Sequence, residues 1–196
     1  MNTNIHTMNV GYLELIFGPM FSGKTTTLIS KYKQHKLLDH KICVINYKED
    51  TRYSETQLST HDGSKIDCIQ CYELTEIWNN RQHNIHNCNI ILINEGQFFK
   101  DIYETVLNMV EEHNKIVYVC GLDSDFRRQK FGNMMDLIPY CDNITKLQSL
   151  CMKCKDGTKA PFTIRINSNT EQKLIGTDEY IPVCRKHLVT PILECI

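Results

Sequence analysis

The stretch Leu15 to Thr26, LIFGPMFSGKTT, runs from an apolar segment through a turn into helix-forming residues. The turn matches G-x-x-x-x-G-K-[ST] in the context that this pattern requires, after a strand and before a helix. Its glycines let backbone N–H groups face an anion, the following helix adds its positive end, and Lys24 adds a fixed charge. An ordinary strand-to-helix turn is the alternative reading. The flanking pattern favours a triphosphate site formed by Gly18, Pro19, Met20, Phe21, Ser22, Gly23, Lys24 and Thr25.

Four short segments rich in Ile, Val and aromatic residues are separated by longer helix-like stretches: residues 12–17, 41–46, 89–93 and 115–120. Between the last two, apolar residues recur at helical spacing. Alternating strands and helices predict an α/β fold, a P-loop parallel sheet with flanking helices. We assign residues 1–145 to this nucleotide-binding domain.

Residues 146–196 have a different texture, with short β-prone pieces such as PFTIRI, KLIG and YIPVC and no long helical pattern. Such a small lobe cannot be held together by apolar burial alone. Cys151 and Cys154, followed about thirty residues later by Cys184 and His187, form the pattern C-x-x-C…C-x-x-H, which suits tetrahedral zinc. The sequence therefore predicts a small lobe of loops and short strands stapled by structural Zn²⁺.

The 196 residues carry a formal net charge of -1 and are 41% hydrophobic. This balance gives no general electrostatic case for binding nucleic acid or a membrane surface. Apolar runs are far shorter than about 18 residues, and the first residues lack a signal-peptide pattern. We therefore expect a soluble, intracellular protein.

Polar residues follow two of the apolar segments. Asn94 and Glu95 come directly after one, and Asp50 follows another, so all three should lie at the carboxyl edge of the sheet beside the triphosphate site. Glu95 could act as a general base or join a metal shell, or it could be a solvated carboxylate. Thr25, Asp50 and Asn94 are the candidates for the Mg²⁺ shell, and Asn94 lacks the charge that draws in a cation. Asp50 on its own could equally be a turn residue.

Five blocks in this order, GPMFSGKT, EDTRYS, NEGQFF, GLDSDFRRQKFG and CMKC…VCRKH, resemble the type II thymidine kinases of vertebrates and poxviruses. The resemblance runs from about Gly11 to His187. It implies Mg²⁺-dependent transfer of the ATP γ-phosphate to the 5′-hydroxyl of thymidine or deoxyuridine. It also implies a homotetramer, a structural zinc in each subunit, a cytoplasmic location (the host's if the protein is viral) and dTTP as feedback inhibitor.

Carried over onto matching positions, Glu95 resembles the catalytic base, and Asp50 resembles the acid that arranges the metal waters near the nucleoside. Asn94 stands where the family has Asp, and His187 where it usually has Cys. The segment Lys155 to Val183 resembles the lasso that folds over the base and binds it through backbone groups. The resemblance places these residues in the nucleoside pocket: Met20, Asp50, Phe98, Leu122, Phe126, Phe131, Thr163, Leu174, Ile175, Gly176 and Tyr180.

Two other functions fit parts of the pattern. The triphosphate motif and the zinc pattern together could belong to a P-loop ATPase whose zinc module grips nucleic acid. The lobe carries several lysines, yet it lacks the alternating aromatic and basic residues used for single strands. A kinase for a different small hydroxylated acceptor is the other alternative. The expected partners are thymidine or deoxyuridine and ATP, with no direct nucleic acid and no membrane.

Overall fold

The computed structural model describes residues 10–50, 57–59, 63–173, 176 and 179–188. Its centre is a six-stranded sheet in the order β5-β2-β6-β7-β1-β8, in which every neighbouring pair is parallel. The strands are β1 (Tyr12–Phe17), β2 (Ile42–Tyr47), β5 (Ile69–Cys71), β6 (Ile90–Ile93), β7 (Ile116–Gly121) and β8 (Asn143–Lys146). The predicted α/β class and its four apolar strands are confirmed, with bounds that differ by at most one residue.

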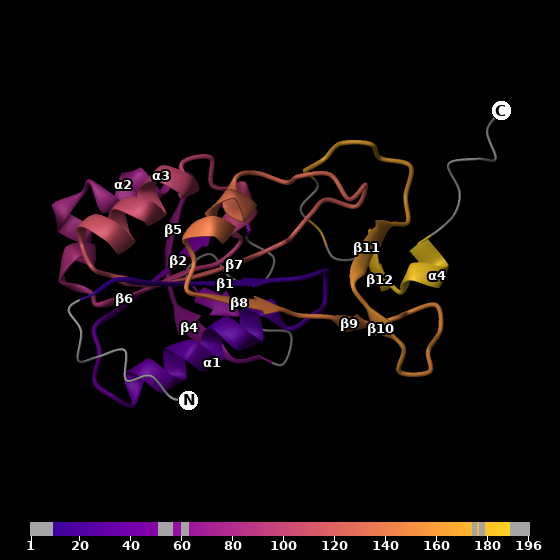
Figure 1. The fold of residues 1–196 in the computed structure, drawn as a ribbon, viewed down its shortest axis with the longest axis horizontal. Coiled ribbons are helices and arrows are strands. Elements are labelled where there is room, and N and C mark those ends of the chain that lie inside the picture. The colour runs from indigo at the N-terminus through magenta and orange to yellow at the C-terminus, as the bar shows by residue number, and fades with distance from the viewer. Residues whose placement is uncertain (1–9, 51–56, 60–62, 174–175, 177–178, 189–196) are drawn as a thin grey trace.

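Helices cover both faces of the sheet, with α1 on one side and α2 and α3 on the other (Figure 1). The α-helices are α1 (Lys24–Lys36), α2 (Leu74–Trp78) and α3 (Ile102–Leu107), which continues as a π-helical turn, η5 (Asn108–Glu112). The 3-10 turns are η2 (Arg81–His83), η3 (Ile85–Asn87), η4 (Gly96–Phe98) and η6 (Met134–Tyr140). A short hairpin pairs β3 (Gln57–Ser59) with β4 (Lys65–Asp67).

The core divides into two layers because alternate residues of each strand face opposite sides. On β1, Leu13 and Leu15 pack with α2 and α3, whereas Ile16 packs with Leu28 and Ile29 of α1. Strands buried on both faces read as continuous apolar runs, which is the pattern that the sequence shows. This two-sided burial fixes the carboxyl ends of β1, β2, β6 and β7 along one edge.

The small lobe follows β8 and contains two short antiparallel pairs. One joins β9 (Ser149–Leu150) to β10 (Lys159–Ala160), and the other joins β11 (Phe162–Arg165) to β12 (Tyr180–Val183), before the single turn α4 (Arg185–Leu188). In Figure 1 this lobe lies beyond the carboxyl end of β1. Its buried core consists of four described residues, Cys151, Ala160, Val183 and Cys184. Such a core is small for a folded unit and supports the expectation of a staple.

Candidate active site

The phosphate-binding loop lies between β1 and α1 and turns twice through the left-handed backbone region. Phe21 has φ 59° and Gly23 has φ 82°, and α1 begins directly afterwards at Lys24. Among the described residues, no side chain caps the first N–H groups of α1, and its first turn carries no acidic residue. A helix start with open N–H groups and no negative charge is a favourable seat for an anion.

Two side chains of the loop have the arrangement expected of a phosphate site. Ser22 Oγ is buried and has no hydrogen-bond partner within the described part of the chain. Lys24 Nζ donates to the carbonyl oxygen of Pro19 at 2.7 Å, so the ammonium group lies folded over the loop itself. A buried hydroxyl without a partner costs free energy, and a phosphate oxygen would satisfy it. The residues of this loop therefore fit a triphosphate.

Hydrogen bonds between described residues attach the small lobe to the phosphate-binding loop. The backbone N–H of Met20 donates to Thr163 Oγ1 of β11 at 2.9 Å, and Ser149 Oγ of β9 donates to the carbonyl oxygen of Phe21 at 3.0 Å. The lobe and the loop are therefore positioned relative to each other by atoms of the loop backbone. We call this junction of Met20 and Phe21 with Thr163 and Ser149 the seam; it is already formed before any ligand binds across the two units.

Glu95 lies where β6 has ended. The strand stops at Ile93, and Glu95 takes a left-handed conformation (φ 57°, ψ 41°) as the residue before η4. Its Oε2 accepts a hydrogen bond from Gln97 Nε2 at 2.6 Å. Because the strand alternation is broken here, the carboxylate joins the lining of a cavity.

Asn94 and Asp50 are buried at the same edge of the sheet, with exposed fractions of 2% and 8%. Asn94 Nδ2 donates to Asn46 Oδ1 at 2.8 Å, while its Oδ1 accepts from the Cys120 thiol at 3.3 Å. Asn46 Nδ2 in turn donates to the backbone carbonyl of Asp50 at 3.4 Å. Asn94 is thus a fixed member of a hydrogen-bonded chain that ties β6 to β2 and β7.

A cavity opens beside Glu95 between the sheet edge and the small lobe. It contains about 490 Å³ of space free of protein atoms, part of it open to solvent. Its lining combines aromatic and aliphatic side chains with a few polar groups, as ligand sites usually do. The lining residues are Met20, Glu95, Gln97, Phe98, Leu122, Ser124, Asp125, Phe126, Phe131, Thr163, Gln172, Gly176 and Tyr180.

The structure brings nine of the predicted site residues together in this lining: Met20, Glu95, Phe98, Leu122, Phe126, Phe131, Thr163, Gly176 and Tyr180. Asp50 is not part of the lining. Leu174 and Ile175 lie outside the described residues. Sequence reasoning missed four lining residues, Gln97, Ser124, Asp125 and Gln172. The first three stand inside the quoted blocks NEGQFF and GLDSDFRRQKFG, so those blocks were the available signal.

Arg165 organises the segment of the lobe that borders the cavity. Its guanidinium group lies 3.9 Å from the ring centre of Phe126 and 4.9 Å from that of Tyr180. It donates to the carbonyl oxygens of Asn169 at 2.8 Å and Glu171 at 2.6 Å, and to the Tyr180 hydroxyl. One side chain thus connects the turn at residues 167–171 to two rings of the cavity wall.

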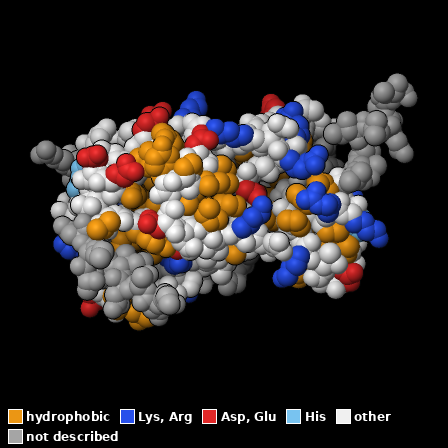
Figure 2. Space-filling model, in the orientation of Figure 1, with side chains coloured by type: hydrophobic (Ala, Val, Ile, Leu, Met, Phe, Trp, Pro, Cys, Tyr) orange, Lys and Arg blue, Asp and Glu red, His pale blue; other side chains and the backbone are white. Residues whose placement is uncertain are grey.

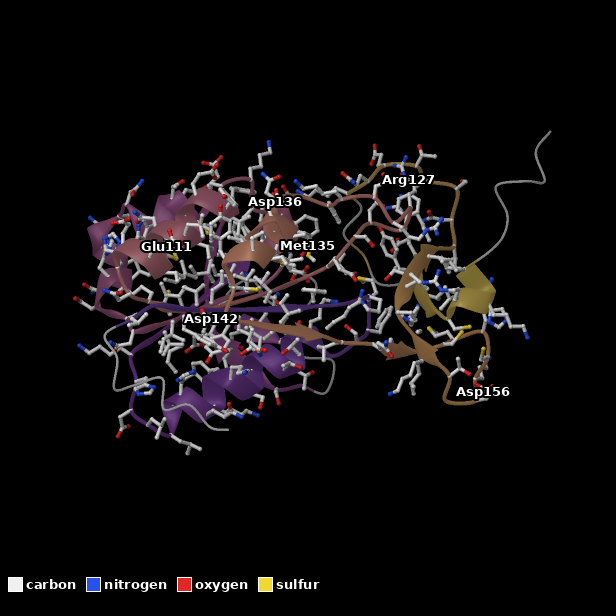
Figure 3. The ribbon with its side chains drawn as sticks, in the orientation of Figure 1. Glu111, Arg127, Met135, Asp136, Asp142 and Asp156 are labelled. Atoms are coloured by element: carbon white, nitrogen blue, oxygen red, sulfur yellow. The ribbon has the colours of Figure 1, made fainter. Side chains whose placement is uncertain are left out.

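Further contacts fasten this segment to the sheet domain. Arg127, labelled in Figure 3, donates to the carbonyl oxygen of Thr170 at 2.5 Å. Gln172 Nε2 donates to Asp125 Oδ2 at 2.9 Å and to the carbonyl oxygen of Lys130 at 3.1 Å. These bonds close the described part of the lobe over the cavity.

Lys173 adds a third attachment, to the end of β2. Its Nζ lies 2.8 Å from Glu49 Oε2, 3.0 Å from the Tyr47 hydroxyl and 4.6 Å from the Tyr47 ring centre. Although partial burial lowers the pKa of Lys173, the hydrogen bonds to Glu49 and Tyr47 leave it raised above its ordinary value. Lys173 therefore stays charged at neutral pH and keeps its ion pair.

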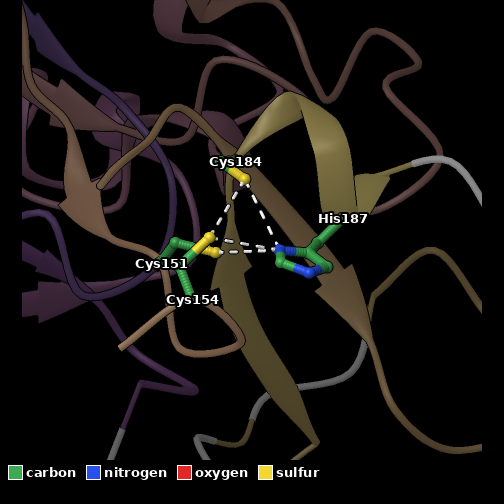
Figure 4. Close-up of side chains that lie close together, drawn as sticks. All are labelled: Cys151, Cys154, Cys184 and His187. Carbon is green, nitrogen blue, oxygen red and sulfur yellow. Dashed lines mark hydrogen bonds between the residues drawn. The ribbon is translucent and has the colours of Figure 1, made fainter. Parts of the chain in front are cut away.

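Cys151, Cys154, Cys184 and His187 form a compact cluster in the small lobe (Figure 4). The distances from His187 Nδ1 to the three sulfurs are 3.6, 3.4 and 3.6 Å, and Cys154 and Cys184 Sγ are 3.7 Å apart. A tetrahedral zinc ion with ordinary bond lengths would separate its ligands by about 3.8 Å for two sulfurs and about 3.5 Å for sulfur and nitrogen. The four side chains therefore have the geometry of a closed zinc site.

Cys151 differs from Cys154 of the same cluster, whose pKa burial raises to about 11, and from the thiols of the sheet. Burial raises the pKa of Cys151, but hydrogen bonds from the backbone of Cys184 and Cys154 and from His187 outweigh it and lower the pKa to about 6. Burial raises the pKa of Cys43 and of Cys120 to about 12. The thiolate is the form that binds a metal, so the lobe favours it at Cys151 while the sheet thiols remain protonated.

A parallel sheet with a glycine-rich loop between β1 and α1, a glutamate after β6 and a partly open cavity lined by residues of both is the arrangement of the P-loop class of α/β enzymes. Comparison with known proteins gives the particular family. The family model of thymidine kinase matches residues 11–188, and the chain belongs to that family.

Several relatives share about two fifths of their residues with this chain. "Thymidine kinase" of Sheeppox virus (strain KS-1) is 42% identical over 181 residues, covering 91% of this chain and 97% of the relative. "Thymidine kinase" of Vaccinia virus (strain Ankara) is 40% identical over 180 residues, with the same coverage. "Thymidine kinase a" of Arabidopsis thaliana is 40% identical over 182 residues, covering 92% of this chain and 76% of the relative. The chain is therefore a transferase of the thymidine kinase family.

In the described part of the chain, no helix has the length and apolar character needed to cross a membrane.

Proposed function

We propose that the protein transfers the γ-phosphate of ATP to the 5′-hydroxyl of thymidine and of deoxyuridine, giving dTMP or dUMP for DNA synthesis by salvage. The observation that carries this proposal is the position of Glu95, whose carboxylate lines the same cavity as Met20 of the phosphate-binding loop. A carboxylate between a phosphate seat and an apolar cavity is the arrangement that hydroxyl phosphorylation requires.

The phosphate-binding loop would hold the donor. Its inward N–H groups and the start of α1 take the phosphate oxygens, and Ser22 Oγ gains the partner that it lacks among the described residues. Lys24 would exchange the Pro19 carbonyl for a phosphate oxygen and would neutralise charge that develops during transfer.

Thr25 and Asp50 suit a magnesium shell, since a hydroxyl at the start of α1 and a carboxylate at the end of β2 are hard oxygen ligands. The amide of Asn94 is held by Asn46 and Cys120, so its contribution would be to position a water rather than to supply charge. Bound Mg²⁺ supplies charge stabilisation to the phosphate oxygens.

Glu95 would act as general base. It would accept the proton of the sugar 5′-hydroxyl while the oxygen forms a bond to the γ-phosphorus, and the bond from that phosphorus to the bridging oxygen of ADP would break. The proton ends on the carboxylate, and the electron pair of the broken bond leaves with ADP.

The cavity would hold the nucleoside base against the rings of Phe98, Phe126, Phe131 and Tyr180 and the side chains of Met20 and Leu122. Thr163 and Gly176 line its lobe side. Main-chain groups of the lobe can match the acceptor, donor and acceptor edge of thymine without special side chains. Leu174 and Ile175, which lie outside the described residues, remain proposed as part of this wall.

The ion in the Cys151, Cys154, Cys184 and His187 cluster would be zinc with a structural role. Three thiolates and one imidazole suit Zn²⁺, and four protein ligands leave no position open for catalysis. The division into residues 1–145 and 146–196 also remains a proposal. It is supported by the separate core of the lobe, although β8 extends to Lys146.

A homotetramer, feedback inhibition by dTTP and a cytoplasmic location complete the proposal, and these rest on the family resemblance. Direct nucleic-acid binding is not part of it. Lys and Arg side chains gather over the small lobe in Figure 2, but its described aromatic residues, such as Phe162 and Tyr180, are not exposed. A surface that binds single strands needs exposed rings on which bases stack.

The test is to incubate the purified protein with γ-labelled ATP, Mg²⁺ and thymidine, and to repeat it with deoxyuridine and a panel of other nucleosides. Label in dTMP is the expected result. ATP hydrolysis stimulated by DNA, with no labelled nucleotide product, would instead establish the P-loop ATPase alternative. Label in a different acceptor would replace thymidine as the substrate.

A further inference from the structure

We infer that Gln97 is a positioning residue for the reaction, which fixes the Glu95 carboxylate in the direction of the acceptor hydroxyl. This inference rests on the proposed function, because it assigns the role through Glu95. Gln97 is polar and yet only 2% exposed, so its amide requires internal partners.

The amide of Gln97 bridges the ends of two neighbouring strands. Its Oε1 accepts from the backbone N–H of Leu122, directly after β7, at 3.0 Å, and its Nε2 donates to Glu95 Oε2, after β6, at 2.6 Å. Only the oxygen of the amide can accept from an N–H group. The Leu122 bond therefore fixes which end of the amide faces Glu95, and a donor always points at the carboxylate.

The surrounding backbone approaches Gln97 so closely that two neighbouring positions have room only for glycine. A Cβ on Gly121 would lie 2.4 Å from Gln97 Oε1, and a Cβ on Gly132 would lie 2.0 Å from the Gln97 carbonyl oxygen. Both distances are too short for any side chain. Gly121 at the end of β7 therefore packs against the Gln97 side-chain amide, and Gly132 before η6 packs against the Gln97 backbone carbonyl.

The backbone of Glu95 shows why such a support has a purpose. Glu95 has φ 57°, a left-handed conformation that residues other than glycine adopt only under strain. The turn places Glu95 in the lining of the cavity, and its side chain can still rotate. A charge-assisted hydrogen bond from a fixed donor limits that rotation. A base held within a fraction of an ångström of its working position can contribute fully to catalysis.

The experiment compares single and double variants with thymidine and ATP as substrates. Gln97→Met removes both hydrogen bonds, and Gln97→Asn keeps an uncharged amide but is one methylene too short to bridge the Leu122 N–H and Glu95. For each we expect kcat to fall by about 10- to 100-fold, the size associated with small misplacement of a catalytic group. The KM values for both substrates should change by less than about threefold, which corresponds to a small change in binding free energy, because Gln97 is proposed to act on Glu95 and not on substrate binding. Gln82→Met, at an exposed position in η2, is the matched control and should leave both constants unchanged.

The double variant Glu95→Gln with Gln97→Met decides whether Gln97 acts through Glu95. If it does, the double variant is no slower than Glu95→Gln alone, because the group to be positioned is already gone. Multiplying losses would show an independent role and overturn the inference, as would unchanged kcat in both Gln97 variants. Melting temperatures identify any variant that is slow because it is unfolded, and Gln97→Asn, the smaller change, then carries the test. If Glu95→Gln alone keeps full turnover, the proposed base is wrong, which is a different failure.

Discussion

At the scale of single residues, the end of β6 decides what the site can do. Asn94 continues the strand direction and is buried in a hydrogen-bonded chain with Asn46 and Cys120. Glu95 leaves the strand through a left-handed turn and reaches the cavity. Two adjacent polar residues therefore have separate roles, since one ties strands together and the other faces the substrate side.

Replacing Glu95 by Gln removes the base and keeps the shape of the side chain. We expect turnover of thymidine to fall by about 10² or more, the size of a lost general base. ADP and thymidine should still bind, because neither the phosphate-binding loop nor the apolar walls change. Steady-state kinetics and calorimetric titration measure the two effects. Glu111→Gln, at the exposed site labelled in Figure 3, is the control with the same chemical change. Full turnover by Glu95→Gln would exclude the assigned role.

Lys24 tests the other half of the reaction. Lys24→Met keeps the length of the side chain and removes its charge. The affinity for ATP should fall, and turnover should fall by about 10² or more, because groups that stabilise developing charge contribute to the rate by about this factor. Thymidine binding should persist, because Lys24 is not part of the cavity lining. Lys33→Met, on the exposed side of α1, should leave both unchanged. Normal ATP affinity in Lys24→Met would mean that the loop holds phosphate without this charge.

At the scale of elements, the segment from β11 to Lys173 works as one clasp over the cavity. Arg165 joins its turn to Phe126 and Tyr180, while Gln172 and Lys173 fasten its end to the sheet domain. Arg165 and Lys173 are not part of the cavity lining, so they can affect the affinity for the nucleoside without touching it. Their energy is used to order the wall before the ligand arrives, which lowers the entropy cost of binding.

Arg165→Ala should therefore raise the KM for thymidine by about tenfold, the effect of losing roughly 1.4 kcal/mol of preorganisation. The KM for ATP should change much less, because the phosphate-binding loop lies on the sheet domain. Arg165→Lys keeps the charge but loses the planar fork that serves two carbonyl groups at once, so it should restore only part of the affinity. Lys159→Ala, at an exposed position of β10 in the same lobe, is the control for loss of a positive charge. Equal effects on both KM values would show general damage instead of a clasp.

Four of the six strands of the sheet followed from local patterns, whereas β5, β8, the clasp and the support of Glu95 did not. Burial on both faces makes β6 a continuous apolar run, and the loop after β1 carries its own glycine signature, so short windows of sequence contain this information. Gln97 and Leu122 are 25 residues apart, and Gln172 and Asp125 are 47 apart. A glutamine has no sequence pattern that reveals such a partner, because the pairing depends on how the strands and the lobe are placed in space.

At the scale of the whole molecule, the two units differ in what stabilises them. The sheet domain has large apolar clusters on both faces, whereas the described core of the lobe has four buried residues and the cluster of Cys151, Cys154, Cys184 and His187. The cavity uses both units, since Glu95 and Phe98 come from one and Thr163 and Tyr180 from the other. The proposed nucleoside site therefore depends on the unit with the smaller apolar core.

Cys151→Ser should lower the melting temperature by about 10 °C. Loss of a metal site is among the changes that cost more than about 4 kcal/mol, and each kcal/mol shifts the melting temperature by about 2–4 °C in a chain of this size. Calorimetry measures the shift, and elemental analysis should find one zinc per chain before the substitution and less after it. Cys141→Ser, a thiol outside the cluster, is the control. If pure, folded protein contained no zinc, the proposal that a zinc ion stabilises the small lobe would be wrong.

Removing the ion from the intact protein with a chelator should separate the two binding functions. Thymidine binding should be lost, because the lobe positions Thr163 and Tyr180. ADP should still bind to the loop after β1, with its affinity reduced by less than about tenfold. That loop belongs to the sheet domain and contacts the lobe through Met20 and Phe21. Calorimetric titration of the metal-free protein with each ligand measures both, and re-addition of Zn²⁺ should restore thymidine binding. Undiminished thymidine binding without metal would show that the lobe keeps its shape through its own packing. Loss of both ligands together would show that the seam at Met20 and Thr163 makes the two units fold as one.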